Sequence, residues 1–323
     1  MWCCKGYDYA GTAIDVNFDG DSYKIMDRNI GAFTAPTLST AAGSDAFEYT
    51  HSLIFQWGRK DPFAAGNLQT PTQWGYMSWI DWAENNGEIK KSPTFYIVGR
   101  SDRSAYKFDP YIVPHNLTET NAILAHSVKN PMTYFTGNNW ASSAATSNGQ
   151  TADWGKLWGN QSATGKGVKT MYDPCPVGYT VASPDRLKFI SATGEKTPSG
   201  ATWQVNATAN LNNADGSAVS NNPLKNSPFG LFFYTKGTRT ESEHPADKTV
   251  VFLPRHNWSS NQGAEKQENF ICLYTNAPSA EESWGGQPYK AVMTYAGYGS
   301  FKESSWSYAA ETTAALPVRC VSE

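Results

Sequence analysis

The sequence predicts an α+β fold in which short strands and long loops outweigh helices. Asn, Ser, Thr and Gly are dense throughout the 323 residues, and segments with helical periodicity are few. Four apolar strand candidates stand in the second half, separated by Gly, Asn, Ser and Pro: 231–234, 250–253, 270–274 and 291–295. Together these observations exclude an all-α protein and predict a sheet-rich C-terminal half.

The first expected element is a strand that follows a turn. Asp19-Gly20-Asp21 is a turn signal, and a strand is expected over 22–27. The polar run Asp27-Arg28-Asn29 comes at the end of this strand, where adjacent charges favour a structural latch over a catalytic acid. Residues 1–16 are expected to form a strand or an extension.

Two helices are expected. The first covers 46–57, where apolar residues fall roughly on one face and Gly58 provides a stop. The second begins after Ser183, a natural N-cap, with Pro184 in the first turn and Gly194 as its end.

Between these helices, residues 64–170 carry isolated aromatic side chains within polar sequence. This pattern predicts long loops pinned by aromatic rings and not a separate domain. Length alone does not decide between one domain and two. Residues 171–323 are expected to supply a helix, a sheet and loops that display recognition residues.

Two cysteines could join distant parts of the chain. Cys175 lies in a turn bracketed by prolines, and Cys320 lies in a short β-prone run near the end. A bond between them would close a loop of 320 − 175 = 145 residues, worth up to about 5 kcal/mol in the chain-entropy picture. Two buried thiols fit the spacing nearly as well, because five cysteines in 323 residues is not a disulfide-dense composition.

Composition limits the partners. Aromatic residues make up 14% and charged residues 17% of the chain, which fits an extracellular binding surface better than a cytosolic enzyme. The net charge of −3 and the lack of a Lys/Arg cluster argue against a nucleic-acid partner. Because no apolar stretch approaches 18 residues, no membrane span is expected. The first residues lack the apolar region of a signal peptide, so either a leader was removed or the chain is not exported by that route.

A set of motifs in a fixed order resembles one family. The motifs are Met26-Asp27-Arg28-Asn29-Ile30-Gly31-Ala32, Gln56-Trp57-Gly58-Arg59-Lys60-Asp61-Pro62, Ser127-Val128-Lys129-Asn130-Pro131, Leu157-Trp158-Gly159, Asp173-Pro174-Cys175-Pro176-Val177-Gly178-Tyr179 and Val318-Arg319-Cys320-Val321. Over residues 17–322 this order resembles the Fibrobacter succinogenes major paralogous domain (FISUMP) family, which is common on the surfaces of Bacteroidetes. The structural motif positions are Asp27, Arg28, Asn29, Trp57, Arg59 and Asp61.

Because it covers nearly the whole chain, the resemblance implies one elaborated domain over 1–323. It also implies a C-type-lectin-like fold, similar to that of formylglycine-generating enzymes. Such a fold has a small twisted antiparallel sheet, two main helices and long loop insertions. The resemblance also implies that Cys175 and Cys320 pair, since the family is expected to join the turn before its helix to its last strand.

The side chains give little support for catalysis or for a metal. The five histidines lack the spacing of a zinc site, and there is no Gly-x-Ser-x-Gly motif of a serine hydrolase. Cys272 lies in an apolar strand, where an inert buried thiol is expected. Asn276, Glu281 and Glu282 are close enough in sequence for a loop calcium site, but such acidic pairs are usually only solvated. We therefore expect no catalytic residue, cofactor or metal.

Aromatic residues are concentrated between Arg255 and Ala310, among Gly, Ser and Asn, as in recognition loops. The candidate ligand-binding residues are Trp258, Trp284, Tyr289, Tyr298, Trp306 and Tyr308. Sugar faces stack on such rings. For each ring, attachment of a loop to the sheet is an equally good explanation.

Three functions follow from these observations. The leading hypothesis is a non-catalytic recognition module, a surface or fimbrial-tip adhesin or glycan-binding protein, with a glycan or protein receptor as its partner and an extracellular or cell-surface location. The first alternative is a receptor-binding protein of a phage or diversified by a retroelement, located on a virion. The second is an enzyme related to the formylglycine-generating group, which rests on fold analogy alone.

Overall fold

The structure is a computed structural model of the whole chain. It describes residues 12–32, 34–40, 50, 52–64, 109–113, 120–129, 131, 133–137, 157–159, 167–191, 206–208, 230–237, 249–254, 258–259, 265–266, 271–279, 290–296, 304–310 and 312–323.

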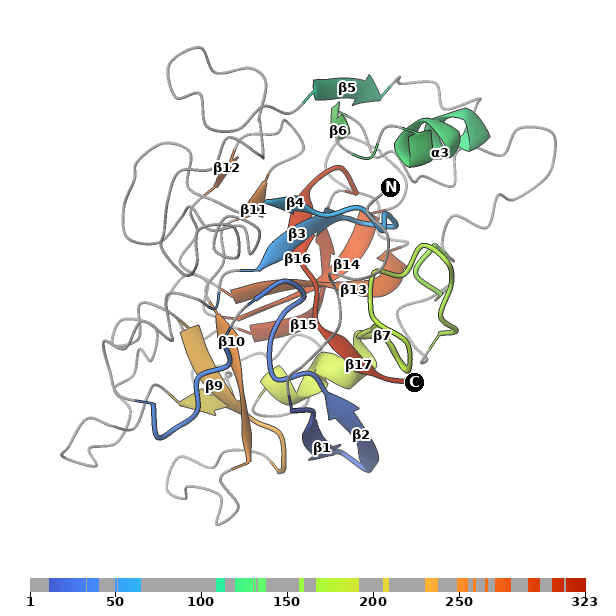
Figure 1. The fold of residues 1–323 in the computed structure, drawn as a ribbon. Coiled ribbons are helices and arrows are strands. Elements are labelled where there is room, and N and C mark those ends of the chain that lie inside the picture. The colour runs from blue at the N-terminus through green and yellow to red at the C-terminus, as the bar shows by residue number, and fades with distance from the viewer. Residues whose placement is uncertain are drawn as a thin grey trace.

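Strands dominate this part of the chain and form small sheets, four of them antiparallel (Figure 1). The sheet β1-β2-β17-β7 is built from Ile14–Phe18, Asp21–Ile25, Cys320–Ser322 and Tyr179–Val181. The sheet β12-β11-β16-β3-β4 is built from Glu265–Lys266, Trp258–Ser259, Ala315–Pro317, Leu53–Gln56 and Phe63–Ala64. The sheet β10-β9-β8 is built from Val250–Pro254, Gly230–Tyr234 and Ala207–Thr208. The sheet β13-β14-β15 is built from Ile271–Ser279, Lys290–Ala296 and Ser304–Ala310.

The fifth sheet lies within the stretch predicted to consist of loops. Strands β5 (Asp109–Val113) and β6 (Thr133–Gly137) pair in parallel, with helix α3 (Thr120–Lys129) between them in the chain. A parallel pair needs a crossover connection, and a helix commonly supplies it. Most of the remaining stretch 64–170 lies outside the described residues.

The prediction of an α+β fold with two main helices is wrong for the part of the chain that the structure describes. Its two helices are short: α3 and the 3₁₀ helix η2 (Asp185–Ile190). Neither has the length and apolar character needed to cross a bilayer.

The predicted helix over 46–57 is also wrong where it can be compared. Residues 53–56 form strand β3, in which every residue is buried. A short apolar run with burial on both sides suits a central strand, and β16, from the far end of the chain, pairs with it at Phe55 and Leu316. The second predicted helix does form after Ser183 and Pro184, but with i→i+3 bonds such as that from the Leu187 N–H to the Pro184 carbonyl.

The predicted strands are confirmed. Strands β9, β10, β13 and β14 cover the four predicted apolar runs, and β2 covers most of 22–27. The turn before β2 is a two-residue hairpin in which Asp19 (φ 51°) and Gly20 (φ 82°) both adopt positive φ. This is the backbone of a type I′ turn, for which Asp-Gly is a preferred pair.

The C-terminal segment lies at the centre of the molecule and joins three sheets (Figure 1). Strand β16 pairs with β3, Val318 forms a bridge with Tyr274 of β13, and β17 lies between β2 and β7. Every residue from 312 to 321 is buried. Two apolar clusters lie around this segment, one including Trp57, Trp158 and Tyr274 and the other including Phe189 and Phe233.

Candidate functional site

The predicted recognition residues lie in the segment 255–310, which we call the display segment. Its described parts are strands β11 to β15. Trp258 lies in β11, and Trp306 and Tyr308 lie in β15; for these three the structure describes the backbone. Trp284, Tyr289 and Tyr298 lie outside the described residues.

The structure assigns the three described candidates to two sheets. Trp258 pairs with Lys266, and Tyr308 pairs with Met293. Val318, which directly follows β16 of the first sheet, forms a bridge with Tyr274 of β13 in the second. Strand β15 has two residues, Trp306 and Ser307, opposite the single Thr294 of β14. This irregularity is a β-bulge, a feature common at sheet edges and next to functional sites.

A second irregularity attaches the display segment to the rest of the fold. In β13, three residues between Tyr274 and Pro278 face a single residue of β14. Two of them bond elsewhere: the Thr275 carbonyl accepts from Trp57 Nε1 at 3.0 Å, and the Asn276 N–H donates to the Ala182 carbonyl at 3.0 Å. The bulge therefore turns backbone groups of the display segment toward the structure that supports it.

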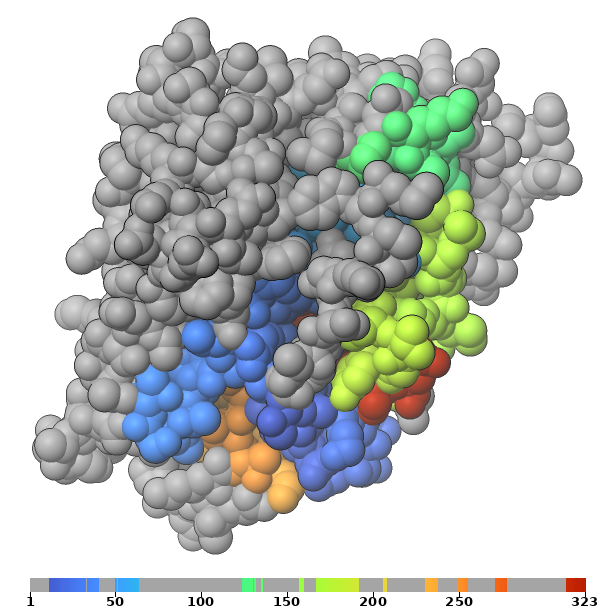
Figure 2. All heavy atoms as spheres, in the orientation of Figure 1, coloured from blue at the N-terminus to red at the C-terminus, as the bar shows by residue number. Residues whose placement is uncertain are grey.

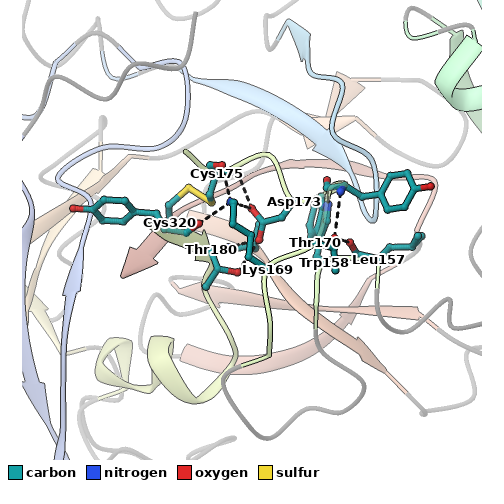
Figure 3. A network of polar contacts seen from close by, with 11 residues as sticks. Leu157, Trp158, Lys169, Thr170, Asp173, Cys175, Thr180 and Cys320 are labelled. Carbon is teal, nitrogen blue, oxygen red and sulfur yellow. Dashed lines mark hydrogen bonds and ion pairs between the residues drawn. A yellow bond between two sulfur atoms is a disulfide. The ribbon is translucent and has the colours of Figure 1, made fainter. Parts of the chain in front are cut away.

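We call the supporting residues 14–30, 53–59, 167–191 and 312–323 the frame. At its centre is the disulfide between Cys175 and Cys320, which confirms the pairing that the resemblance implied (Figure 3). The bond ties the turn ahead of β7 to the first residue of β17. Cys272, which is buried and takes no part in this bond, lies in the same apolar cluster.

A buried carboxylate organises the turn around the disulfide (Figure 3). Asp173 Oδ1 accepts from the Cys175 N–H at 2.7 Å and from Lys169 Nζ at 3.1 Å. Its Oδ2 accepts from Thr180 Oγ1 at 2.7 Å and from the Val181 N–H at 3.0 Å. Four donors thus satisfy this buried charge, as such a charge requires.

The Lys169 ammonium has a complementary set of acceptors. Besides Asp173, Nζ donates to the carbonyls of Cys175 and Tyr179, each at 2.7 Å. All three of its N–H groups therefore have acceptors. Lys169 thus joins the two ends of the turn that holds Cys175, through Asp173 before the cysteine and the Tyr179 carbonyl after it.

The indole of Trp158 links this turn to the display segment. Its Nε1 donates to the Tyr172 carbonyl at 3.1 Å, and Thr170 Oγ1 bonds to the Leu157 carbonyl. The buried Trp158 ring lies 5.9 Å from the ring of Trp57 and 6.0 Å from that of Tyr274 in β13.

Arg319 connects the last segment to two other parts of the molecule. This buried guanidinium donates to Asn29 Oδ1 at 2.7 Å and to the carbonyls of Met26 and Phe252 at 2.8 Å each. Phe252 lies in β10, which ends just before the display segment.

The polar run predicted to be a latch has structural contacts. The Arg28 guanidinium donates to both Asp27 oxygens, at 2.9 and 3.1 Å, while Asn29 accepts from Arg319. These contacts hold the chain at the end of β2.

The second predicted motif also has structural contacts. Arg59 is buried, donates to Gln56 Oε1 at 2.9 Å and lies over the rings of Phe63 and Phe135 at 5.1 and 4.7 Å. Burial raises the pKa of Asp61, and the charges of Arg59 and Lys60 oppose that shift.

Three important residues were not among the predicted site residues: Gln56, Lys169 and Asp173. Asp173 had a signal, because its carboxylate bonds the N–H two residues later in the manner of an Asx turn. Gln56 begins one of the resemblance motifs, but no local pattern shows its role, because its amide donates to the carbonyls of Phe135 and Thr313, which are far away in sequence.

The described residues contain no group of three or more His, Cys, Asp or Glu side chains arranged to hold a metal ion. Comparison of the chain with protein families, with curated proteins and with solved structures finds no significant match in any of the three.

Proposed function

We propose that this protein is a non-catalytic recognition module of a cell surface, an adhesin or glycan-binding protein that binds its receptor through the display segment. The proposal rests on the aromatic and small polar composition of that segment and on its attachment to a rigid frame. The resemblance of the motif order to the FISUMP family agrees with it.

The attachment at the borders of the display segment is the observation that supports the proposal most directly. On one side, the Phe252 carbonyl accepts from Arg319 at 2.8 Å. On the other side, the Ala314 carbonyl accepts from Tyr274 Oη at 3.0 Å. In the middle, the Thr275 carbonyl accepts from Trp57 Nε1 at 3.0 Å. Ends fixed in this way reduce the entropy that recognition loops lose on binding.

A location outside the cytosol is part of the proposal. Disulfides persist in oxidising compartments, and the Cys175–Cys320 bond is buried in the core.

The test is a binding screen of the folded protein on arrays of glycans, mucins and host-cell surfaces. Trp284→Ala and Trp306→Ala should each weaken a detected interaction by at least about fivefold, as expected for aromatic hot spots. Trp82→Ala is a matched control, because Trp82 lies outside the display segment. Near-UV circular dichroism should show that all three variants remain folded.

The proposal fails if the folded protein binds none of these surfaces. It also fails if Trp284→Ala and Trp306→Ala bind as the wild type does while Trp82→Ala does not.

A further inference from the structure

The bulge in β13 is the place where the frame contacts the middle of the display segment. Its three residues, 275–277, are fully buried, and two of them, Thr275 and Asn276, are polar. Buried polar groups are normally hydrogen-bonded. The partners of this bulge therefore show what the sheet β13-β14-β15 rests on.

Three described segments of the frame contact the bulge. Trp57 Nε1, just after β3, donates to the Thr275 carbonyl at 3.0 Å. The Asn276 N–H donates to the carbonyl of Ala182, just after β7, at 3.0 Å. The Asn276 side chain lies beside Gly167, where a Cβ would be 3.0 Å from Nδ2. Because these contacts come from three segments, they restrain the bulge in more than one direction.

The frame around these contacts is itself held together. In Figure 2 the last residues (red) lie between 167–191 (yellow-green) and the strands β1 and β2 (blue), in agreement with the strand pairing. The Cys175–Cys320 bond joins two of these parts. Trp57 is buried, and its ring lies 5.9 Å from that of Trp158, so close packing leaves its indole little freedom to turn. The indole N–H is therefore a fixed donor for the Thr275 carbonyl.

The strand pairing connects the bulge to predicted recognition residues. On one side of the bulge, Tyr274 pairs with Met293 of β14, and Met293 pairs in turn with Tyr308 of β15. On the other side, Pro278 pairs with Ala291 of β14. A bulge bends its strand and increases the local twist, so its geometry affects the strands paired on both sides of it.

We propose that Trp57 is a positioning residue for recognition. Its indole N–H holds the bulge, and through the bulge it sets the position of the sheet that carries Trp306 and Tyr308. Trp57 is buried and touches no receptor, so a change at this residue acts on binding through the fold alone. The effect on receptor binding rests on the proposed function, whereas the effect on the bulge does not.

The experiment uses Trp57→Phe in the full chain, which removes the indole N–H and keeps an aromatic ring. Backbone hydrogen exchange, followed by mass spectrometry, should become faster by about tenfold in the peptide covering 271–279, because the buried Thr275 carbonyl loses this donor. Exchange in the hairpin 14–25 should stay as in the wild type. For a receptor found in the binding screen, Kd should rise by about threefold or more, because the recognition strands are less well ordered before binding. If Trp57→Phe does not fold, benzothienylalanine at position 57 keeps the shape of Trp with sulfur in place of the N–H.

Trp158→Phe is the matched control. Trp158 is also buried and lies beside Trp57, but its Nε1 donates to the Tyr172 carbonyl of the frame. Each variant loses one indole N–H and alters the same ring contact, so a merely structural role of Trp57 would make the two behave alike. Trp158→Phe should speed exchange in 167–175 and change both the exchange of 271–279 and the receptor Kd by less than about twofold.

The proposal is overturned if the two variants speed exchange in 271–279 equally, or if Trp57→Phe speeds exchange in every peptide alike. Faster exchange of the bulge with an unchanged receptor Kd would also overturn it, because the bulge would then not control recognition. If the screen finds no receptor, the proposed function fails separately, and the exchange experiment still decides whether Trp57 holds the bulge.

Discussion

At the scale of single residues, the buried charges of the frame act by hydrogen bonding to backbone. Arg319 bonds two carbonyls and an amide oxygen, and Asp173 bonds two N–H groups, a hydroxyl and an ammonium. Such residues fix the relative positions of segments that no regular ladder joins. Removing one partner from such a site costs more than the bond itself contributes, because the other groups stay buried.

Asp173→Asn tests this role. In this variant an NH₂ group replaces one of the two side-chain oxygens, and it cannot accept from the two donors that it faces. The free energy of unfolding should therefore fall by about 2–4 kcal/mol. Urea denaturation followed by intrinsic fluorescence measures the change. Asp15→Asn is the control, because Asp15 is an exposed carboxylate paired with Lys24, and its loss should cost far less than the loss of the buried Asp173 carboxylate. Equal losses in the two variants would contradict the role given to Asp173.

Asp61 provides a test with pH. Burial raises the pKa of this carboxyl in the folded state above its unfolded value of about 3.9. Ionisation then favours the unfolded chain as pH rises from about 4 to the folded pKa, so Asp61 lowers stability above this window and not below it. Asp61→Asn should therefore raise Tm at pH 7 and leave it almost unchanged at about pH 3.

Asp15→Asn serves as the control for this pH dependence, because its sign is opposite. Lys24 lowers the pKa of Asp15, so that carboxylate stabilises the fold above its unfolded pKa and loses the effect as pH falls. Thermal unfolding of Asp61→Asn and Asp15→Asn between about pH 3 and pH 7 should show changes in Tm of opposite sign. An Asp61→Asn variant that gains nothing at pH 7 would show that its carboxylate is adequately solvated or paired.

At the scale of elements, glycines with positive φ form the turns and the close contacts. Gly20 has φ +82° with open space where a Cβ would lie, whereas at Gly159, with φ +89°, a Cβ would lie 1.9 Å from the Val168 carbonyl oxygen. The Val168 N–H also donates to the Gly159 carbonyl at 2.7 Å. The first glycine is thus needed for its conformation alone, and the second for both conformation and space.

This difference predicts two sizes of effect. Gly20→Ala should lower the free energy of unfolding by about 1 kcal/mol, the cost of a left-handed conformation. Gly159→Ala should cost at least about twice as much, because the backbones at 159 and 168 must separate as well. Chemical denaturation of the two single variants measures both. If Gly159→Ala were as mild as Gly20→Ala, the close contact between 159 and 168 would not exist in solution.

The same elements show what the sequence could predict. The Asp19–Gly20 hairpin and the apolar strands were predictable, because turn chemistry and β-branched or aromatic runs are local signals. The strand over 53–56 was not, since its apolar run fits a helix as well and its partner β16 is more than 250 residues away. The Ser183–Pro184 signal predicts where a helix begins but not whether its bonds run i→i+3 or i→i+4, so the 3₁₀ form of η2 could not be predicted.

The candidate site was predictable to a smaller extent. The aromatic composition of the display segment is visible in the sequence, and Trp258, Trp306 and Tyr308 do fall on strands. At the bulges 275–277 and 306–307, one strand has more residues than its partner between two paired positions. No local sequence pattern predicts this. The bonds from Trp57 and Arg319 to this part of the fold join residues whose sequence separation exceeds 60, so only the folded structure shows them.

At the scale of the whole molecule, the last ten residues are the common partner of the separate sheets. Strand β16 completes one sheet, Val318 bridges to a second, and β17 lies inside a third. Short strands of this kind are only marginally stable alone. The fold should therefore unfold cooperatively when this segment is released, and the Cys175–Cys320 bond opposes its release by closing a loop of 145 residues.

Reduction of that bond is the corresponding prediction. When the wild type is equilibrated in denaturant with a strong reductant, its free energy of unfolding should fall by up to about 5 kcal/mol. This is the stabilisation expected from closing a loop of this length in the unfolded chain. The double variant Cys175→Ala with Cys320→Ala should resemble the reduced wild type and show no response to reductant. Cys272→Ala should retain the full response, because Cys272 is not part of the Cys175–Cys320 bond. Suppose that the wild type, reduced so that both cysteines react with a thiol reagent, unfolds at an unchanged denaturant midpoint. That result would mean that packing alone holds the central segment in place.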